Sequence, residues 1–551
     1  MKNIAKTASV CALLCVAGCS LDYFPDNAIT QEQIKTSAEG AEYATIGNYS
    51  LYKDILTFRN ADNTGNTYIR HYFQATEFKS DNIAIDMPTT DQFYDCMVYN
   101  QTPDNTPSSY LWYVIYKMAV SASGVIEALQ DGASPALDNL KGENLFMRAL
   151  CHLHLVTLFA QPYGNGRDNP GVVIRTSADI KETKRATVGE VYDRIVTDLK
   201  DAARLMTLDK GAGYASKAAA YGLLSRVYLY MEQYGDAIQA ANDCLAIRPE
   251  SNLTTTADLP TYFANALTST ETLFAVACTD VDDKGQSSIA SMYLKDGIGW
   301  GEIFASHPLR DLLDKYPGDM RRKFIIPKYK GADTLPDVNN ATAMFNYSIE
   351  DAGGIGGTTQ ILSRLAAVYY FNGSFYSAPN GGGAQVQSAA NGKYSLTIDG
   401  AAKEGYLIPN IEDDRETGFP IYYIAKFSYQ NGNPMLSSPV MLRLAEVVLN
   451  RAEAKFKNSD VTGATADLNT IRRRAGIPNA GSVTLDSILD ERRRELCFEG
   501  HRAFDLIRNN RPIDRRYPGA HPAVVIEPSN PRNIYYIPNM EIEVSGIPQN
   551  P

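Results

Sequence analysis

The chain has 551 residues, of which 44% are hydrophobic and 21% are charged, and 63 acidic against 52 basic side chains give a formal net charge of −11. These values are typical of globular proteins, so they exclude a disordered chain, a collagen-like repeat and a small disulfide scaffold. Nucleic-acid-binding proteins normally carry a basic surface, so the acidic balance predicts that nucleic acid is not a partner.

The N-terminus has the pattern of an export signal. Lys2 and Lys6 form a short basic region, and the apolar run from Ala8 to Ala17 is shorter than the roughly 20 residues that a membrane-spanning helix needs. Small residues precede Cys19 in the sequence VAGC, which is typical of a signal cut ahead of a cysteine that receives lipid. The alternative is an ordinary secretory signal. The predicted boundaries are a signal peptide at 1–18, a lipidated tether at 19–36 and a single domain at 37–551.

Helical periodicity dominates two separate stretches of the predicted domain. Apolar residues recur there at i, i+3, i+4 and i+7, which indicates amphipathic helices. The predicted helices cover 110–129, 140–159, 188–206 and 215–247 (broken at 233–235), then 438–457, 464–475 and 485–509. Small residues and tyrosines within 215–247 look like a tetratricopeptide helical hairpin, which needs neighbouring hairpins to cover its apolar face. We therefore predict one helical scaffold built from about 108–250 and 438–510.

The stretch between these helical blocks has a different character. Gly, Asn, Ser, Thr and Asp dominate from about 252 to 436, and the glycine-rich segment 372–393 is predicted to be a long loop. Residues 57–101 are similarly irregular and rich in aromatics. Long loops in compact proteins are usually functional. We predict a mostly α fold in which a tetratricopeptide-like helical-hairpin scaffold carries a large, irregular, loop-rich ligand-binding face.

Sequence motifs for catalysis and metal binding are missing. The sequence has no HExxH, no Cys/His zinc spacing, no GxSxG and no GxxxxGK[ST] phosphate loop. We therefore predict no metal, no cofactor and no enzymatic activity. Carboxylates are abundant, however, so a glycoside hydrolase that uses two of them stays as an alternative.

A charge-dense block occupies residues 490–502 (DERRRELCFEGHR). Its arginines would suit a phosphate-binding patch. Glu491, Glu495 and Glu499 recur beside them every four residues, however, and this spacing favours ion pairs within and between helices. We predict a structural role for this block.

Several segments in chain order carry a family resemblance. They are Cys19 followed by Leu21-Asp22 and Pro25, KGE and RA within 141–149, SPVMLRLAE at 438–446, LNTIRRRAG at 468–476, ERRRELCFEGHRAFD at 491–505, and YIP to QNP at 536–551. Together they resemble the SusD/RagB family of outer-membrane lipoproteins. The departures are Cys497 and Ala503, which replace the usual Ala and Trp and suggest local repacking.

The resemblance implies a non-catalytic, SusD-like lipoprotein on the cell surface, held in the outer membrane by lipid on Cys19. Members of this family sit over a SusC-like TonB-dependent transporter and capture oligosaccharides for import, in polysaccharide utilisation and nutrient uptake. RagB-type members capture peptides, so peptide capture stays as an alternative. The helical face would meet the transporter and the irregular face would hold the ligand.

Candidate ligand-binding residues follow from the chemistry of sugars. Sugar C–H faces stack on aromatic rings, while polar side chains bind the hydroxyls, and such groups are expected on irregular segments. Trp300 is the first candidate, because the sequence GIGWG offers little to bury an indole locally. The other candidates are Tyr72, Phe73, Tyr293, Phe375 and Tyr376 for stacking, with Asp81 and Asn82 as hydroxyl partners.

Overall fold

The fold is described here from a computed structural model, which describes residues 34, 37–59, 65–91, 93–179, 183–329, 342–353, 357–390, 393–408, 411–413 and 418–550. The predicted signal peptide, Cys19 and nearly all of the tether lie outside these residues. Within them, no helix is both long enough and apolar enough to cross a membrane.

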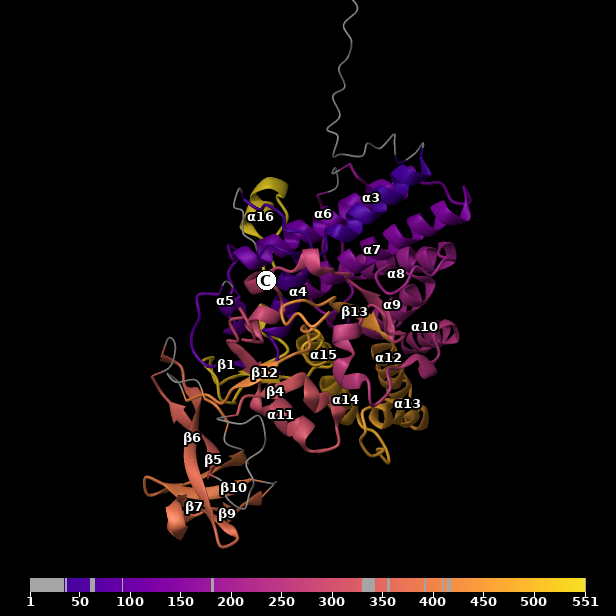
Figure 1. The fold of residues 1–551 in the computed structure, drawn as a ribbon. Helices are drawn as coiled ribbons and strands as arrows, with labels where there is room; N and C mark the ends of the chain where they lie inside the picture. The colour runs from indigo at the N-terminus through magenta and orange to yellow at the C-terminus, as the bar shows by residue number, and fades with distance from the viewer. Residues whose placement is uncertain are drawn as a thin grey trace, which may run out of the picture.

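Consecutive helices of the first block pack side by side, as the periodicity predicts (Figure 1). They are α6 (Thr106–Ala128), α7 (Pro135–Phe159), α8 (Val188–Leu205), α9 (Lys217–Tyr230) and α10 (Tyr234–Ile247). The start of α8 is a capping box, in which the Thr187 hydroxyl accepts the Glu190 amide N–H and the Glu190 carboxylate accepts the Thr187 amide N–H. Two groups that would otherwise be unpaired at the helix start are thereby satisfied.

The second helical block continues the same layer, because α12 packs against both α9 and α10. Its elements are β13 (Val440–Arg443), α12 (Leu444–Lys457), α13 (Val461–Arg474), α14 (Leu485–Leu496) and α15 (Arg502–Arg508). Two predicted helices were too long. Residues 440–443 form a strand, and the helix expected over 485–509 is interrupted where Phe498 and Gly500 take positive φ angles of 68° and 80°.

Short elements surround the two blocks. They are α3 (Ala38–Ser50), α4 (Tyr68–Glu77), β1 (Ile83–Ile85), α5 (Tyr94–Met97), β2 (Thr272–Ala275), β3 (Ile303–Ala305), α11 (His307–Asp314), β4 (Ile325–Pro327), β12 (Tyr422–Ile424), β14 (Ile513–Asp514), β15 (Val525–Ile526) and α16 (Asn539–Ser545). Strand pairs β1–β3, β2–β13 and β4–β12 join segments that are far apart in sequence. The segment 57–101, predicted to be irregular, contains the amphipathic helix α4.

The central stretch also contains a sheet where we predicted loops. β5 (Thr342–Asp351), β6 (Gln360–Phe371), β7 (Ser374–Ala378), β8 (Gly382–Gln385), β9 (Gln387–Ser388), β10 (Tyr394–Ile398) and β11 (Ala401–Ile408) form one sheet in the order β8-β7-β6-β5-β11-β10-β9. This sheet lobe projects from the rest of the molecule (Figure 1) and has its own small core around Phe345, Val368 and Leu396. The predicted long loop over 372–393 was therefore wrong.

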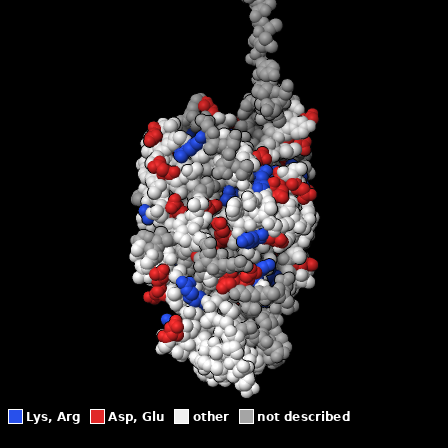
Figure 2. Space-filling model, turned by 60° about the vertical axis from the view of Figure 1, so that its left-hand side comes forward, with Lys and Arg blue, Asp and Glu red and all other residues white. Residues whose placement is uncertain are grey.

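The sheet lobe differs from the body in its charge. Arg364 is the only charged residue between Gln360 and Asn391 in the sequence. Figure 2 shows the same contrast, because acidic and basic side chains are scattered over the body while the lower end of the molecule is almost free of them on that face.

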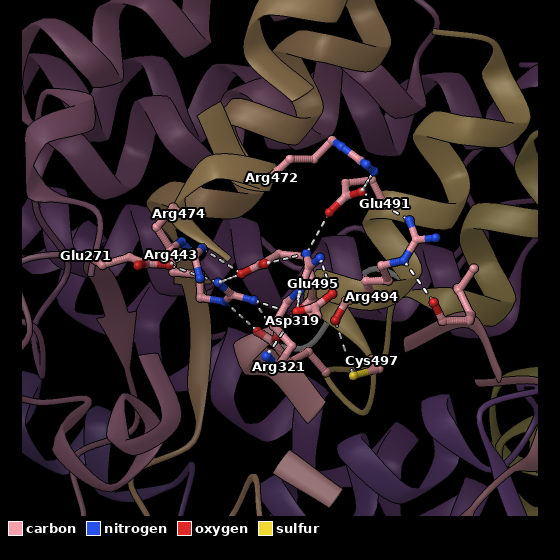
Figure 3. Close-up of polar contacts among 12 residues, drawn as sticks. Glu271, Asp319, Arg321, Arg443, Arg472, Arg474, Glu491, Arg494, Glu495 and Cys497 are labelled. Atoms are coloured by element: carbon pink, nitrogen blue, oxygen red, sulfur yellow. Dashed lines mark hydrogen bonds and ion pairs between the residues drawn. The ribbon is translucent and has the colours of Figure 1, made fainter. Parts of the chain in front are cut away.

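A buried network of arginines and glutamates joins the helical blocks to the central stretch (Figure 3). One carboxylate oxygen of Glu495 in α14 accepts hydrogen bonds from Arg443 at 2.6 Å and from Arg474 at 2.7 Å. The other oxygen accepts one from Arg321 at 3.1 Å. The remaining pairs include Arg321 with Asp319 and Glu491, Arg443 with Glu271 and Glu499, and Arg472 with Glu491. The structural role predicted for residues 490–502 is confirmed, since these charges are paired inside the protein.

We expect Glu495→Gln to lower the free energy of unfolding by about 3–5 kcal/mol, because it leaves the buried guanidinium groups without their shared carboxylate. Urea denaturation measures the change. Asp193→Asn is the matched control, since Asp193 pairs with Arg167 on the surface, with more than half of each side chain exposed, and should change stability by no more than about 0.5 kcal/mol. Equal effects of the two substitutions would contradict the assignment.

Stability should also fall as the pH is lowered from about 6.5 to 4. Burial lowers the pKa of His152 to about 4, although Asp198 partly opposes the shift. Nε2 of His152 accepts the amide N–H of Arg175, so protonation would break that hydrogen bond. In the unfolded chain His152 binds a proton near pH 6.5, whereas in the folded chain it stays neutral down to about pH 4. Stability is therefore lost as the pH falls through this window. Burial likewise lowers the pKa of the other five histidines: His71, His154, His307, His501 and His521.

The check is urea denaturation at pH 7.0, 5.5 and 4.5. His152→Gln should flatten the dependence by about one proton, and a stability that does not change over this range would contradict the prediction.

Candidate functional site

Trp300 presents its indole ring to solvent, with 50% of the residue exposed. The backbone beneath it is fixed, because the amide N–H groups of Trp300 and Gly301 both donate to the carbonyl of Ser291, at 2.8 and 2.9 Å. Glycine is required at 299, where a Cβ atom would collide with the carbonyl oxygen of Leu294, and Gly301 has a φ of +60°. The glycines thus let the chain fold tightly and leave the indole outside.

Polar and apolar side chains lie close to Trp300 in the chain or bond to its chain neighbours. Glu302 accepts the Thr89 hydroxyl at 3.1 Å, and Asp296 accepts the Tyr429 hydroxyl at 3.0 Å. Ile298 and Met87 are also exposed. We call residues 87–89, 296–302 and 429 the Trp300 surface. An exposed ring beside carboxylates with free lone pairs can stack on a sugar and accept its hydroxyl hydrogens.

A cleft lies at the other end of β3, between the body and the sheet lobe. We call it the lobe cleft, and its volume is about 270 Å³. Tyr406 of β11 donates to Asp311 of α11 at 2.9 Å, and the His307 ring lies edge-on to Tyr406 at 4.6 Å. Burial raises the pKa of Asp311, while the Tyr406 hydroxyl opposes that shift. The lining includes His307, Asp311, Tyr347, Lys393, Glu404, Tyr406 and Arg516.

Sequence reasoning missed the lobe cleft. Its residues come from α11, β5, β11 and the segment after β14, which are up to about two hundred positions apart in the chain. No local pattern marks them as neighbours. The predicted site therefore included none of them.

Two of the predicted stacking residues lie in the hydrophobic core. Phe73 and Tyr293 are at most 1% exposed, and both rings pack against Phe427, at 5.1 and 6.0 Å between centroids. A ligand on the surface does not reach them. Their burial gives them a packing role in place of the predicted stacking role. Phe73 lies on the buried side of α4, and Tyr293 follows the buried turn 290–292.

Asp81 and Asn82 are also buried, and other side chains occupy their polar atoms. Asp81 binds Arg502 at 2.8 Å and Arg493 at 3.3 Å, and Asn82 accepts from Arg493 at 2.8 Å and donates to Glu77 at 2.8 Å. Burial alone would raise the pKa of Asp81, but the two arginines hold it well below its usual range. These residues fix the chain before β1, and the expected role as hydroxyl partners is corrected accordingly.

The three remaining candidates are separated from Trp300. Tyr72 lines a small cavity of about 60 Å³ on the other side of α4, where its ring stacks on His154 at 4.1 Å. Phe375 and Tyr376 lie on β7 at the outer end of the sheet lobe (Figure 1). Phe375 packs toward the lobe core and Tyr376 faces the other side, so the structure does not bring the predicted residues together in one site.

Comparisons with known proteins agree with this architecture. A family profile described as the SusD family matches residues 346–546, and one described as starch-binding and associating with the outer membrane matches residues 30–229. A SusD-like protein of Formosa agariphila is 22% identical over 542 residues, covering 90% of this chain and 88% of that protein. A SusD-like protein of Bacteroides ovatus is 23% identical over 412 residues, covering 72% of this chain and 64% of that protein.

Solved structures share the fold over nearly the whole chain. A SusD superfamily protein from Bacteroides thetaiotaomicron has a TM-score of 0.70 at 24% identity, covering 94% of this chain and 100% of that one. A laminarin-binding SusD-like protein has a TM-score of 0.58 at 20% identity, covering 94% of this chain and 99% of that one. The predicted mostly helical SusD-like fold is confirmed. With both halves of the chain matched by profiles of this family, the chain belongs to the SusD/RagB family.

Proposed function

We propose that this protein is a cell-surface glycan-binding lipoprotein that captures oligosaccharides and delivers them, without catalysis, to a SusC-like TonB-dependent transporter in the outer membrane. The observation that carries the proposal is the exposed indole of Trp300, held outward by a backbone that requires glycine on both sides. A ring carried on a fixed backbone loses less conformational entropy when a ligand covers it than a ring on a mobile loop does.

The surroundings of Trp300 supply the polar part of such a site. Glu302 and Asp296 each have one fixed hydroxyl partner and further lone pairs for ligand hydroxyls. The lobe cleft adds Tyr406 and Asp311 at the far end of β3, which suits a ligand longer than one sugar ring. The relatives described as starch-binding and laminarin-binding support a glycan as the ligand.

Membrane attachment belongs to the same proposal. Residues 1–18 would be removed as a signal peptide, and lipid on Cys19 would anchor the protein. One lipidated cysteine carries several acyl chains in such lipoproteins, which is the kind of anchor that holds a protein without a spanning helix. The helical layer would meet the transporter, leaving the Trp300 surface for the ligand.

Calorimetric titration of the full chain in detergent with maltoheptaose, laminarihexaose and a peptide pool tests the ligand. Trp300→Ala should weaken glycan binding by about tenfold or more, because covering an indole of this size contributes about 1.5–3 kcal/mol. Tyr43→Ala is the matched control, since Tyr43 is an exposed ring on α3 and should leave the affinity unchanged.

Three outcomes of the titration would contradict the proposal. Unchanged affinity in Trp300→Ala would remove Trp300 from the site. Heat from peptides alone would establish the peptide-capture alternative. Cleavage of a glycan by the pure protein, detected by chromatography of the products, would establish the hydrolase alternative.

Tryptophan fluorescence gives an independent check, because the chain has only two tryptophans and Trp112 is 4% exposed. In Trp112→Phe, the emission of Trp300 should be quenched by acrylamide, and a bound glycan should protect it. In Trp300→Phe, the remaining emission should resist quenching in the absence of ligand. Equal quenching of the two variants would show that the indole of Trp300 is not placed as described.

A further inference from the structure

A large hollow lies between α6 and α16, and none of its lining residues belongs to the Trp300 surface. Its volume is about 770 Å³, within the range of sites that bind small molecules and short oligomers. We call it the α6–α16 groove. It is lined by α6, by α16 and by two segments that run alongside them, around Phe58 and Val173.

The floor of the groove is aromatic. Tyr113 and Tyr116 of α6 are half-buried, and each ring packs against another aromatic side chain, Phe58 at 5.3 Å and Trp112 at 4.8 Å. The rim is apolar, since Met540 and Val544 of α16 are exposed. Rings that are supported by their neighbours and open on one side are the surfaces on which sugar C–H faces stack.

Three cationic side chains lie next to aromatic rings of the groove. The guanidinium of Arg59 lies 5.2 Å from the Phe58 centroid, and that of Arg175 lies 5.9 Å from the Tyr116 centroid. The ammonium of Lys117 lies 5.8 Å from the Tyr113 centroid. Within the described part of the chain, none of the three has a carboxylate at ion-pair distance. Such a cluster is unusual in a protein whose formal net charge is −11.

Glu541, the one carboxylate among the described lining residues of the groove, already has hydrogen-bond partners. Glu541 accepts the indole N–H of Trp112 at 3.2 Å on one oxygen and the Ser545 hydroxyl at 2.5 Å on the other. The bond from Trp112 fixes α16 against α6, and the bond from Ser545 lies within α16. Among the described residues, no carboxylate forms an ion pair with the cations of the groove.

Arg175 is the most constrained of the three cations. Its amide N–H donates to His152 Nε2 at 3.0 Å and its carbonyl accepts the Ser123 hydroxyl at 3.3 Å, which holds the backbone against α6 and α7. Its Nη1 atom is buried and has no hydrogen-bond partner among the described residues. A buried guanidinium nitrogen without a partner is costly, and a rotation of the Arg175 side chain into the groove would let a ligand oxygen satisfy it.

We propose that the α6–α16 groove binds an anionic oligosaccharide, one that carries carboxylate or sulfate groups on its rings. The open faces of Tyr113 and Tyr116 would stack on the sugar rings, and Arg59, Lys117 and Arg175 would bind the acidic groups. Guanidinium groups form strong paired hydrogen bonds with carboxylates and sulfates. The proposal rests on the proposed function only for the class of ligand, which is a glycan. None of the groove residues belongs to the Trp300 surface.

The geometry favours a sugar over an acidic protein segment. The groove is concave and of small-molecule size, whereas a stable protein interface buries about 800 Å² on each partner and is broad. Each cation also lies next to an aromatic ring, and this alternation of ring and charge matches a polymer that has an acidic group on each ring.

The test is titration of the full chain in detergent with tetragalacturonate, its methyl-esterified form, a chondroitin sulfate tetrasaccharide and hexaglutamate. The double variant Arg59→Gln/Lys117→Gln should bind the acidic sugars at least about tenfold more weakly, since two charge-assisted hydrogen bonds are lost. Lys200→Gln is the matched control, because Lys200 is an exposed helical cation 5.9 Å from a tyrosine ring outside the groove. Raising the salt concentration should weaken binding to the wild type.

A second readout is the fluorescence of Trp300→Phe, in which Trp112 is the sole tryptophan and its N–H lies on Glu541 in the groove. Tetragalacturonate should change this emission, and its methyl ester should not. Because Trp300 is absent from this variant, the result is independent of neutral glycan binding at the Trp300 surface.

The proposal is overturned if no acidic sugar binds, or if the double variant binds them as the wild type does. Binding of hexaglutamate alone, lost in the double variant, would assign the groove to an acidic protein segment instead. Equal binding of the ester and the acid would show that the cations do not select the ligand.

Discussion

The shared contact of three arginines with Glu495 is the interaction on which the architecture depends. Arg443 comes from β13, Arg474 from α13 and Arg321 from the central stretch, so one carboxylate of α14 joins three separate parts of the chain. Burial raises the pKa of a carboxyl, but here the surrounding guanidinium charges lower that of Glu495 well below its usual range. An uncompensated charge at this depth would be strongly destabilising, so these segments are stable only where the charges stay paired.

Helix α14, which carries Glu495, also positions the candidate ligand site. Arg493, next to the network, binds Asp81 and Asn82, and the Ser306 hydroxyl donates to the Asp81 carbonyl at 2.6 Å. These bonds hold β1 against β3, and Trp300 lies three residues before β3. Asp81 and Asn82 thus act on the Trp300 surface through the backbone that they hold, although neither touches its solvent-exposed side.

A feature of the fold could be predicted from the sequence only where residues that are neighbours in the chain mark it. Periodicity located the main helices, and the glycines beside Trp300 correctly indicated an exposed ring. The sheet lobe had local signals that were missed, since Asn372-Gly373 and Asp399-Gly400 both take positive φ angles in the tight turns between β6 and β7 and between β10 and β11. The lobe cleft had no local sequence signal, because its residues come from distant segments. The burial of Phe73 could not be foreseen without α4, whose neighbours come from distant segments.

Charge separates the two surfaces to which ligands are assigned. The Trp300 surface carries Asp296 and Glu302, which in the proposed function would accept the hydroxyl groups of a neutral sugar and would repel an acidic one. In the part of the chain that the structure describes, the α6–α16 groove carries three cations without ion pairs and one carboxylate, Glu541, which already has hydrogen-bond partners, and this would give it the opposite preference. Screening by salt acts on the charged contacts of the groove and hardly on the stacking at Trp300. Neutral and acidic stretches of one polysaccharide would therefore bind at different places, with affinities that respond differently to ionic strength.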